Sequence, residues 1–290
     1  MENEARGTAR KENSFLWSFR ILESPFLRKR GLRCFSSIMK NFFFLQYMQA
    51  VFKRRPVAQS DHPLDEKIPF TPAKVNIYLD FIAYWIRAIG FMLRSFGRQA
   101  LAGTGEFIDS IGDLYKKAAE VYTEKFSTTR RPRYLARMRF ITIHTFDPHL
   151  MCIPSLHVMI VIRTYTFFRE AIRRMGTGLE RKYSPKIEEV RRRGIAITEA
   201  VLYVKQHSVN CISAAMYAMT CFDPALFPPE EGERFVSELF VGSPYISAED
   251  QKRIREYILG LYKAFLSEGK NAPSWKEPLM KFLDSLPVSK

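Results

Sequence analysis

The feature that most constrains the fold of this chain is a series of apolar, aromatic-rich segments that polar residues repeatedly interrupt. No stretch of the sequence reaches the roughly 18–20 uncharged apolar residues of a clear membrane-spanning helix. Residues 34–52 come nearest, with basic clusters at residues 28–30 and 53–55 beside them. This pattern predicts a helix that lies either at a membrane interface or inside a soluble domain. The residues alone leave both interpretations open.

A second apolar segment, residues 75–93, contains Asp80 and Arg87. Seven residues separate these charges, so they fall near one face of a helix, and we expect that face to meet water or protein. Alternation of the strand type is scarce, and polar stretches at 54–72 and 175–194 are expected to be loops between helices. The sequence therefore predicts an all-α protein, a helical bundle whose apolar helices can be embedded in a membrane.

The same pattern divides the chain into three regions. We expect a basic N-terminal region with an aromatic amphipathic or membrane helix (1–56), a helical core (57–222) and a helical C-terminal appendage (223–290). Prolines between residues 221 and 244 predict an irregular connector. Ser247 is a good helix cap, and apolar residues follow it at helical spacing up to Gly269.

The charge of the chain points to anionic partners. Its formal charge is +15, and residues 230–290 hold 9 basic and 10 acidic side chains, so +16 lies on residues 1–229. Such a field attracts an acidic lipid surface, phosphorylated substrates or nucleic acid without choosing among them. The four cysteines form no Cys-x-x-Cys pair and are expected to be reduced. The N-terminus lacks the pattern of a cleaved signal peptide, and we expect association with a membrane, either integral or peripheral.

The residues that could bind a ligand or take part in a reaction are concentrated between 128 and 211. Pro154 and Ser155 precede an apolar run, which predicts a helix start whose free amides attract phosphate, with His157 in the first turn. Lys205 and His207 fall within a segment, 200–219, that is otherwise apolar and is expected to be helical. A cation and an imidazole in such a helix favour a functional site. The basic turn 128–134 can hold phosphate oxygens through its arginines.

In this order and spacing, the segments resemble the three motifs of the type 2 phosphatidic acid phosphatase and haloperoxidase superfamily. Arg131-Pro132 is similar to the end of the first motif, Pro154-Ser155-Leu156-His157 to the second, and His207 to the histidine of the third. The segment 205–209 is also similar to the histidine segment of the lipid phosphotransferase branch. The resemblance covers about residues 120–220.

The resemblance implies a phosphatase or phosphotransferase that acts on a phosphate ester, with a lipid phosphate as the expected substrate. It implies that His207 attacks phosphorus and forms a phosphohistidine, and that His157 protonates the leaving alcohol. Phosphate-binding roles fall to Arg131 and Ser155, with Lys205 and Lys125 as further cations. No metal and no cofactor are implied. An anionic membrane surface is an expected partner and specific nucleic acid is not, while the oligomeric state stays open.

The sequence also departs from the family pattern. The lysine of the first motif should stand at Glu124, but Lys125 is one residue too close to Arg131. The arginine expected six residues before His207 is Val201, and the aspartate expected four residues after it is Cys211. An imidazole without its orienting carboxylate loses the group that fixes its tautomer and stabilises its charged form. Weakened or lost activity is therefore one expectation.

Two other interpretations use the same residues. His207 and Cys211 lie four apart, and His149, Cys152 and His157 lie close together in sequence, so imidazole and thiolate ligands for zinc are one alternative. A non-catalytic protein that binds anionic membranes through its basic face is the other.

Overall fold

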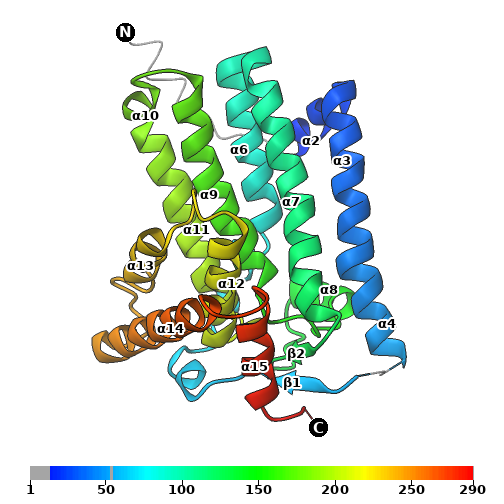
Figure 1. The fold of residues 1–290 in the computed structure, drawn as a ribbon, viewed down its shortest axis with the longest axis vertical. Coiled ribbons are helices and arrows are strands. Elements are labelled where there is room, and N and C mark those ends of the chain that lie inside the picture. Colours follow the sequence, from blue (N-terminus) through cyan, green and yellow to red (C-terminus); the bar gives the residue numbers. More distant parts are fainter. Residues whose placement is uncertain (1–13, 53–54, 290) are drawn as a thin grey trace.

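The computed structural model describes residues 14–52 and 55–289, and it is mostly helical, which confirms the all-α prediction. Long helices run roughly along the longest axis of the molecule, while α14 crosses its lower end (Figure 1). The long helices are α3 (Pro25–Ile38), α6 (Phe81–Phe96), α7 (Leu101–Tyr122), α9 (Leu156–Met175) and α11 (Ser184–Tyr203).

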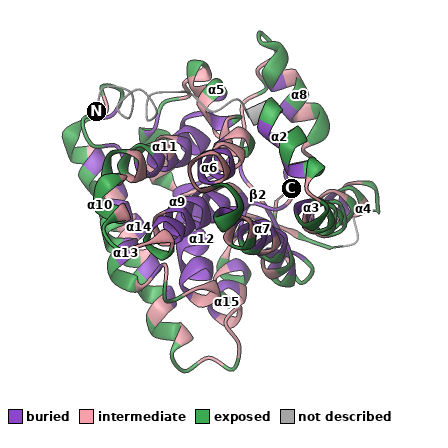
Figure 2. Cartoon of the chain, turned by 90° about the horizontal axis from the view of Figure 1, so that it is seen from above, coloured by how far each residue is buried: buried purple, intermediate pink, exposed green. Residues whose placement is uncertain are grey.

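Helix α9 is the centre of the bundle. It packs against α6, α7, α11 and α12 (Val209–Phe222), and Figure 2 shows these helices around it with their inward faces buried. Its apolar start is buried almost completely, and the buried Arg163 donates to Asp223 at 2.5 Å and to Ser110 at 2.9 Å. A charge inside a bundle is tolerated only with such partners, so Arg163 fixes how α9 sits against α7.

The N-terminal region forms a helical wall beside the core. Helix α2 (Ser14–Glu23) packs on α6, and α3 packs on α7 and continues through a π-helical turn (Met39–Phe44) into α4 (Leu45–Phe52). The helix predicted for residues 34–52 is thereby confirmed, as far as the described residues extend. The two helices α3 and α7 approach closely at Gly112, where an added Cβ would lie 3.2 Å from Cys34 Cα. Ser37 Oγ donates to the Gly112 carbonyl at 2.7 Å.

Residues Pro72–Tyr122 contain the one helical stretch, among the described residues, that is long and apolar enough to cross a membrane. This stretch consists of short 3₁₀ turns (Pro72–Lys74 and Gly97–Ala100), α5 (Val75–Tyr78), α6 and α7. The polar face predicted for its first half meets protein. Arg87 donates to Asp80 at 2.9 Å, and Arg193 of α11 donates to the same carboxylate at 2.8 Å.

Two predicted loops contain helices. The polar stretch 175–194 holds α10 (Leu179–Lys182) and the first half of α11, because its charges lie on helix faces and find partners. Arg191, for example, is buried and pairs with Glu231 and Glu238. The connector 221–244 holds α13 (Pro229–Ser237), which provides Glu231. Prolines start this helix instead of preventing it, since proline is accepted in a first helical turn.

The stretch 54–72 was expected to be a surface linker, and its described part lies at the surface of the lower end of the molecule, with a few side chains anchored in the core. Strand β1 (Val57–Gln59) pairs in parallel with β2 (Phe126–Thr128), and a 3₁₀ turn (Pro63–Lys67) follows. Ala58, Ser60 and Ile68 are buried. The stretch is therefore a surface segment as expected, but it contains a short strand and a 3₁₀ turn, and its irregular backbone can pack against the core because its polar groups are paired.

The C-terminal helices cover the lower end of the bundle. Helix α14 (Ala248–Gly269) begins and ends as predicted, and the Ser247 hydroxyl accepts from the Asp250 amide at 3.1 Å. Helix α15 (Glu277–Ser285) follows, and Val288 bridges to β1 at Ala58. Among the described residues, buried side chains from Ile21 to Leu283 join one hydrophobic cluster.

Candidate functional site

The two histidines of the second and third motifs meet in the structure. His207 Nε2 lies 3.2 Å from His157 Nδ1, although fifty residues separate them in sequence. His207 is 7% exposed, and the rings of Tyr78 and Phe81 pack on His157 at centroid distances of 4.9 and 4.4 Å. Both imidazoles line one cavity.

His207 does not lie within a helix as expected. Helix α11 ends at Tyr203 and α12 begins at Val209, so residues 204–208 form a turn in which Lys205 has a φ of 56°. The left-handed backbone at Lys205 turns the chain sharply between the two helices. A non-glycine residue in this conformation is strained and needs stabilising contacts. The turn carries the His207 ring into the bundle.

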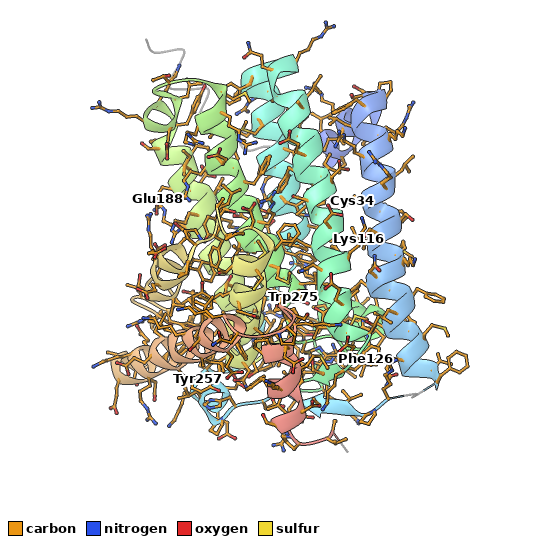
Figure 3. The ribbon with its side chains drawn as sticks, viewed as in Figure 1. Cys34, Lys116, Phe126, Glu188, Tyr257 and Trp275 are labelled. Carbon is orange, nitrogen blue, oxygen red and sulfur yellow. The ribbon has the colours of Figure 1, made fainter. Side chains whose placement is uncertain are left out.

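Support for the turn comes from the 3₁₀ segment Pro63–Lys67 and the residue that follows it. Lys205 Nζ donates to the carbonyls of Asp65 and Ile68, and the Asp65 carboxylate accepts from the Val209 amide at 2.9 Å. Lys205 therefore holds the backbone of its own turn and does not point into the histidine cavity, contrary to its expected phosphate-binding role. The ring of His62, which caps this segment, stacks on Tyr257 of α14 at 3.8 Å between centroids. Figure 3 labels Tyr257 at the lower end of the molecule.

The start of α9 follows the prediction from Pro154 and Ser155. Ser155 is the N-cap residue with an extended backbone, and its amide donates to the Cys211 carbonyl at 3.4 Å. Its hydroxyl makes no capping bond. That oxygen is buried and has no hydrogen-bond partner among the described residues.

Arg131 contacts Asp147, which lines the histidine cavity, while Lys125 lies elsewhere. Arg131 Nη2 donates to the Asp147 carbonyl at 2.8 Å and Nη1 to Gln206 Oε1 at 3.2 Å. Its guanidinium is also 3.8 Å from the Asp147 carboxylate. Lys125 instead pairs with Asp284 of α15, so the structure does not bring this expected cation to the cavity.

The cavity at the histidine pair is small. Its volume is about 20 Å³, and it is lined by Phe42, Gln46, Asp147, His149, Met151, Cys152, Leu156, His157 and His207. One water molecule needs about this space. A phosphate group can therefore enter only if the two imidazoles, now in direct contact, move apart.

Burial governs the protonation of the pair. It lowers the pKa of His157 to about 4, against a smaller opposite effect of Asp147. Burial, with repulsion from His157, also holds the pKa of His207 well below its ordinary value. Both rings are neutral at pH 7 in the empty site. Burial alone would raise the pKa of Asp147, but His149 and Arg131 bring it below its ordinary value, so this carboxylate is charged.

Asp147 and Gln46 line the cavity, and the sequence did not single them out. Asp147 follows α8 (Met138–Phe146) and accepts from the His149 amide at 2.9 Å. Gln46 comes from α4, far outside the motif span, and its Oε1 accepts from the Leu150 amide at 2.9 Å. The one available signal for Gln46 was an uncharged polar residue inside an aromatic helix. For Asp147 no periodicity or motif gave a signal.

Three buried polar atoms at or beside the cavity lack a hydrogen-bond partner among the described residues. They are Gln46 Nε2, Ser155 Oγ and His207 Nδ1. Buried polar atoms are nearly always paired, so these three can each bond to a ligand or to a water molecule. An amide, a hydroxyl and a ring nitrogen can all donate to an anion.

Four residues of the zinc interpretation, His149, Cys152, His157 and His207, line the small cavity, whereas Cys211 does not. Cys211 Sγ lies 3.4 Å from the Ser208 amide and 3.9 Å from Ser60 Oγ, and burial raises the pKa of its thiol to about 12. Cys152 Sγ is 3.7 Å from His149 Nε2, which also contacts Thr129. In the part of the chain that the structure describes, no three His, Cys, Asp or Glu side chains are arranged to hold a metal ion.

Comparison of the chain with protein-family models, with curated proteins and with solved structures found no match.

Proposed function

We propose that this protein is a phosphatase or phosphotransferase of the phosphatidic acid phosphatase type, which acts on a phosphate ester through a phosphohistidine. The observation that supports this most strongly is the 3.2 Å contact between His157 and His207. Two motif segments that are distant in sequence deliver two imidazoles to one buried point, beside a third segment that delivers Arg131. Histidines that only stabilise a core do not need to contact each other.

In the proposed reaction, His207 Nε2 attacks phosphorus while the bond from phosphorus to the ester oxygen breaks. His157, which takes up a proton from solvent when the phosphate dianion binds, gives this proton to the leaving alkoxide, which departs as an alcohol. Water or an acceptor alcohol then attacks the phosphohistidine, and His157 takes up the proton of that nucleophile. Arg131, the Ser155 hydroxyl and the Gln46 amide are the groups placed to hold the phosphate oxygens.

Asp147 offers a substitute for the aspartate that Cys211 replaces. Its charge favours the protonated forms of both His157 and His207. In the family pattern a carboxylate bonds the nucleophilic ring directly, whereas here no carboxylate among the described residues bonds His207 Nδ1, and the Cys152 backbone is the polar group that favours the charged ring from close by. We infer that Asp147 stabilises the imidazolium electrostatically but does not fix the tautomer of His207. Low intrinsic activity follows, because orientation of the nucleophile is lost.

The test measures phosphate release from p-nitrophenyl phosphate and from phosphatidic acid, together with an acid-labile phosphoryl label on the protein. His207→Ala is expected to abolish label and turnover, and His157→Asn to lower turnover about 10²–10⁴-fold. Cys211→Asp is expected to raise turnover about tenfold or more, since it supplies the orienting carboxylate. His144→Ala, on the half-exposed helix α8, is the matched control and should change neither.

If the wild type and Cys211→Asp are both inactive and both fail to bind vanadate, the proposed enzymatic activity is ruled out. Only a fold of this type would then remain as the proposal. Loss of wild-type activity in Cys211→Asp would give the thiol a role of its own, beside Ser60.

A further inference from the structure

A second, much larger cavity lies next to the histidine pair. Its volume is about 650 Å³, within the range of roughly 300–1,000 Å³ that is usual for small-molecule sites. Helices α2 and α3 form one side, α6 and α7 the other, and α8 and the start of α9 contribute to its wall. Almost all of the lining is apolar, including Ile108, Ile111 and Ile160.

The inner end of this apolar cavity is the histidine site itself. Phe42, Asp147, Leu156 and His157 line both cavities. Among the residues that line the large cavity, Asp147 provides the carboxylate and His157 the imidazole. A molecule that fills the apolar cavity therefore has one end within reach of the imidazoles and the rest among hydrocarbon side chains.

The outer end opens through a ring of apolar side chains. Phe35 of α3 is 60% exposed, Ile82 of α6 50% and Phe146 of α8 63%, and all three line the cavity. Exposed apolar patches of this kind mark contacts with membranes or proteins. A polar rim would instead be expected around a cavity for a water-soluble ligand. An apolar rim on an apolar cavity admits a ligand from a hydrocarbon phase.

We propose that this cavity binds one hydrocarbon chain of a phosphorylated lipid, which enters sideways from the membrane between α3 and α6. The headgroup phosphate would then meet His157 and His207, and this part of the inference rests on the proposed function. The binding of the chain does not, because it depends only on the size, lining and continuity of the cavity.

The test is a series of 1-alkyl phosphates from six to twelve carbons, with the corresponding alcohols, titrated into the purified full chain by calorimetry. Each methylene that enters the cavity should tighten binding about fourfold. Ile111→Phe places a ring in the cavity and should weaken decyl phosphate and decanol at least tenfold, with inorganic phosphate unaffected. Ala102→Phe, exposed on the same helix α7, is the control and should leave all ligands unchanged.

Affinity that does not depend on chain length in the wild type would overturn the inference, whether or not Ile111→Phe folds. The same holds if Ala102→Phe weakens decyl phosphate as much as Ile111→Phe does. If alcohols and phosphates bind equally with chain-length dependence and His207→Ala changes neither, the hydrocarbon site stands and the phosphate function fails. If inorganic phosphate binds but chain length has no effect, the reverse holds.

Discussion

His157 and His207 are harder to protonate in the empty site than in water, and this property determines when the site accepts an anion. A doubly charged anion between the rings would favour their charged forms, so its binding must be coupled to proton uptake. Sulfate is a suitable probe because it keeps its charge over the relevant pH range.

We predict that sulfate binds more tightly as the pH falls from 7.5 to 5.5. The pKa of His157 is about 4 without ligand and rises when the anion binds, so protons are taken up between those two pKa values. For each proton taken up, affinity should rise by up to about tenfold per pH unit. Calorimetry in buffers of different ionisation enthalpy measures the proton uptake directly. His157→Gln should reduce it, and equal uptake in both proteins would exclude His157 as the titrating group.

At this scale the sequence predicted the residues that belong to motifs and missed those that tertiary structure supplies. His157 and His207 contact each other, and Arg131 contacts Asp147 at the edge of their cavity. Lys205 does not point into this cavity, because the left-handed turn that it forms is held by its own ammonium group. Gln46 could not be placed from sequence, since α4 reaches the cavity only through the packing of α3 on α7.

Among the elements, the 3₁₀ segment Pro63–Lys67 has the most direct effect on the site. It lies under the turn 204–208, accepts hydrogen bonds from Lys205 and the Val209 amide, and contacts α14 through His62. A carboxylate at the N-terminus of α12 also interacts favourably with the helix dipole. Asp65 thus positions His207 without contacting the imidazole pair.

We predict that Asp65→Ala lowers the free energy of unfolding by about 1–2 kcal/mol, because the Val209 amide loses its acceptor at a helix start. Hydrogen exchange of the amides in residues 205–212 should become faster. Glu66→Ala, an exposed acidic neighbour, is the control and should change neither quantity. Equal thermal midpoints and equal exchange for the two variants would contradict the role of Asp65.

The helices themselves were predictable to the extent that local signals mark their ends. Ser247 and Gly269 bound α14 as expected, since capping and periodicity agree there. The break at residues 204–208 carries no glycine or proline, so an apolar pattern that continues across it predicts one helix where there are two. The stretch 54–72 was predicted to be a loop, yet residues 57–59 form strand β1. Parallel pairing of β1 with β2 is a non-local contact that composition cannot indicate.

At the scale of the whole molecule, exposed apolar side chains accompany basic ones on the N-terminal wall. Met39, Phe44 and Val51 are 42%, 65% and 70% exposed. Arg28 and Lys29 are exposed on the preceding turns of α3. Aromatic and aliphatic side chains beside arginine and lysine suit the interface of an anionic membrane, which makes this wall the expected contact surface.

We predict that changing Met39, Phe44 and Val51 together to serine weakens sedimentation with anionic liposomes more than about tenfold, because three apolar side chains no longer enter the membrane. Val241→Ser with Tyr245→Ser changes exposed apolar residues on the connector before α14 and is the control. If the triple variant sediments unchanged and alkaline carbonate does not release it from the liposomes, residues 72–122 would instead be the segment that attaches the protein to the membrane.

The pairing of β1 has a consequence for how the protein is made. Gln59 donates to the Pro287 carbonyl at 2.7 Å, and the Ser289 amide donates to the Val57 carbonyl at 2.7 Å. Strand β1 is therefore covered by residues synthesised more than two hundred positions later. A ribosome exposes residues 57–59 long before that cover exists, so β1 keeps an unpaired edge until the C-terminal residues have been made.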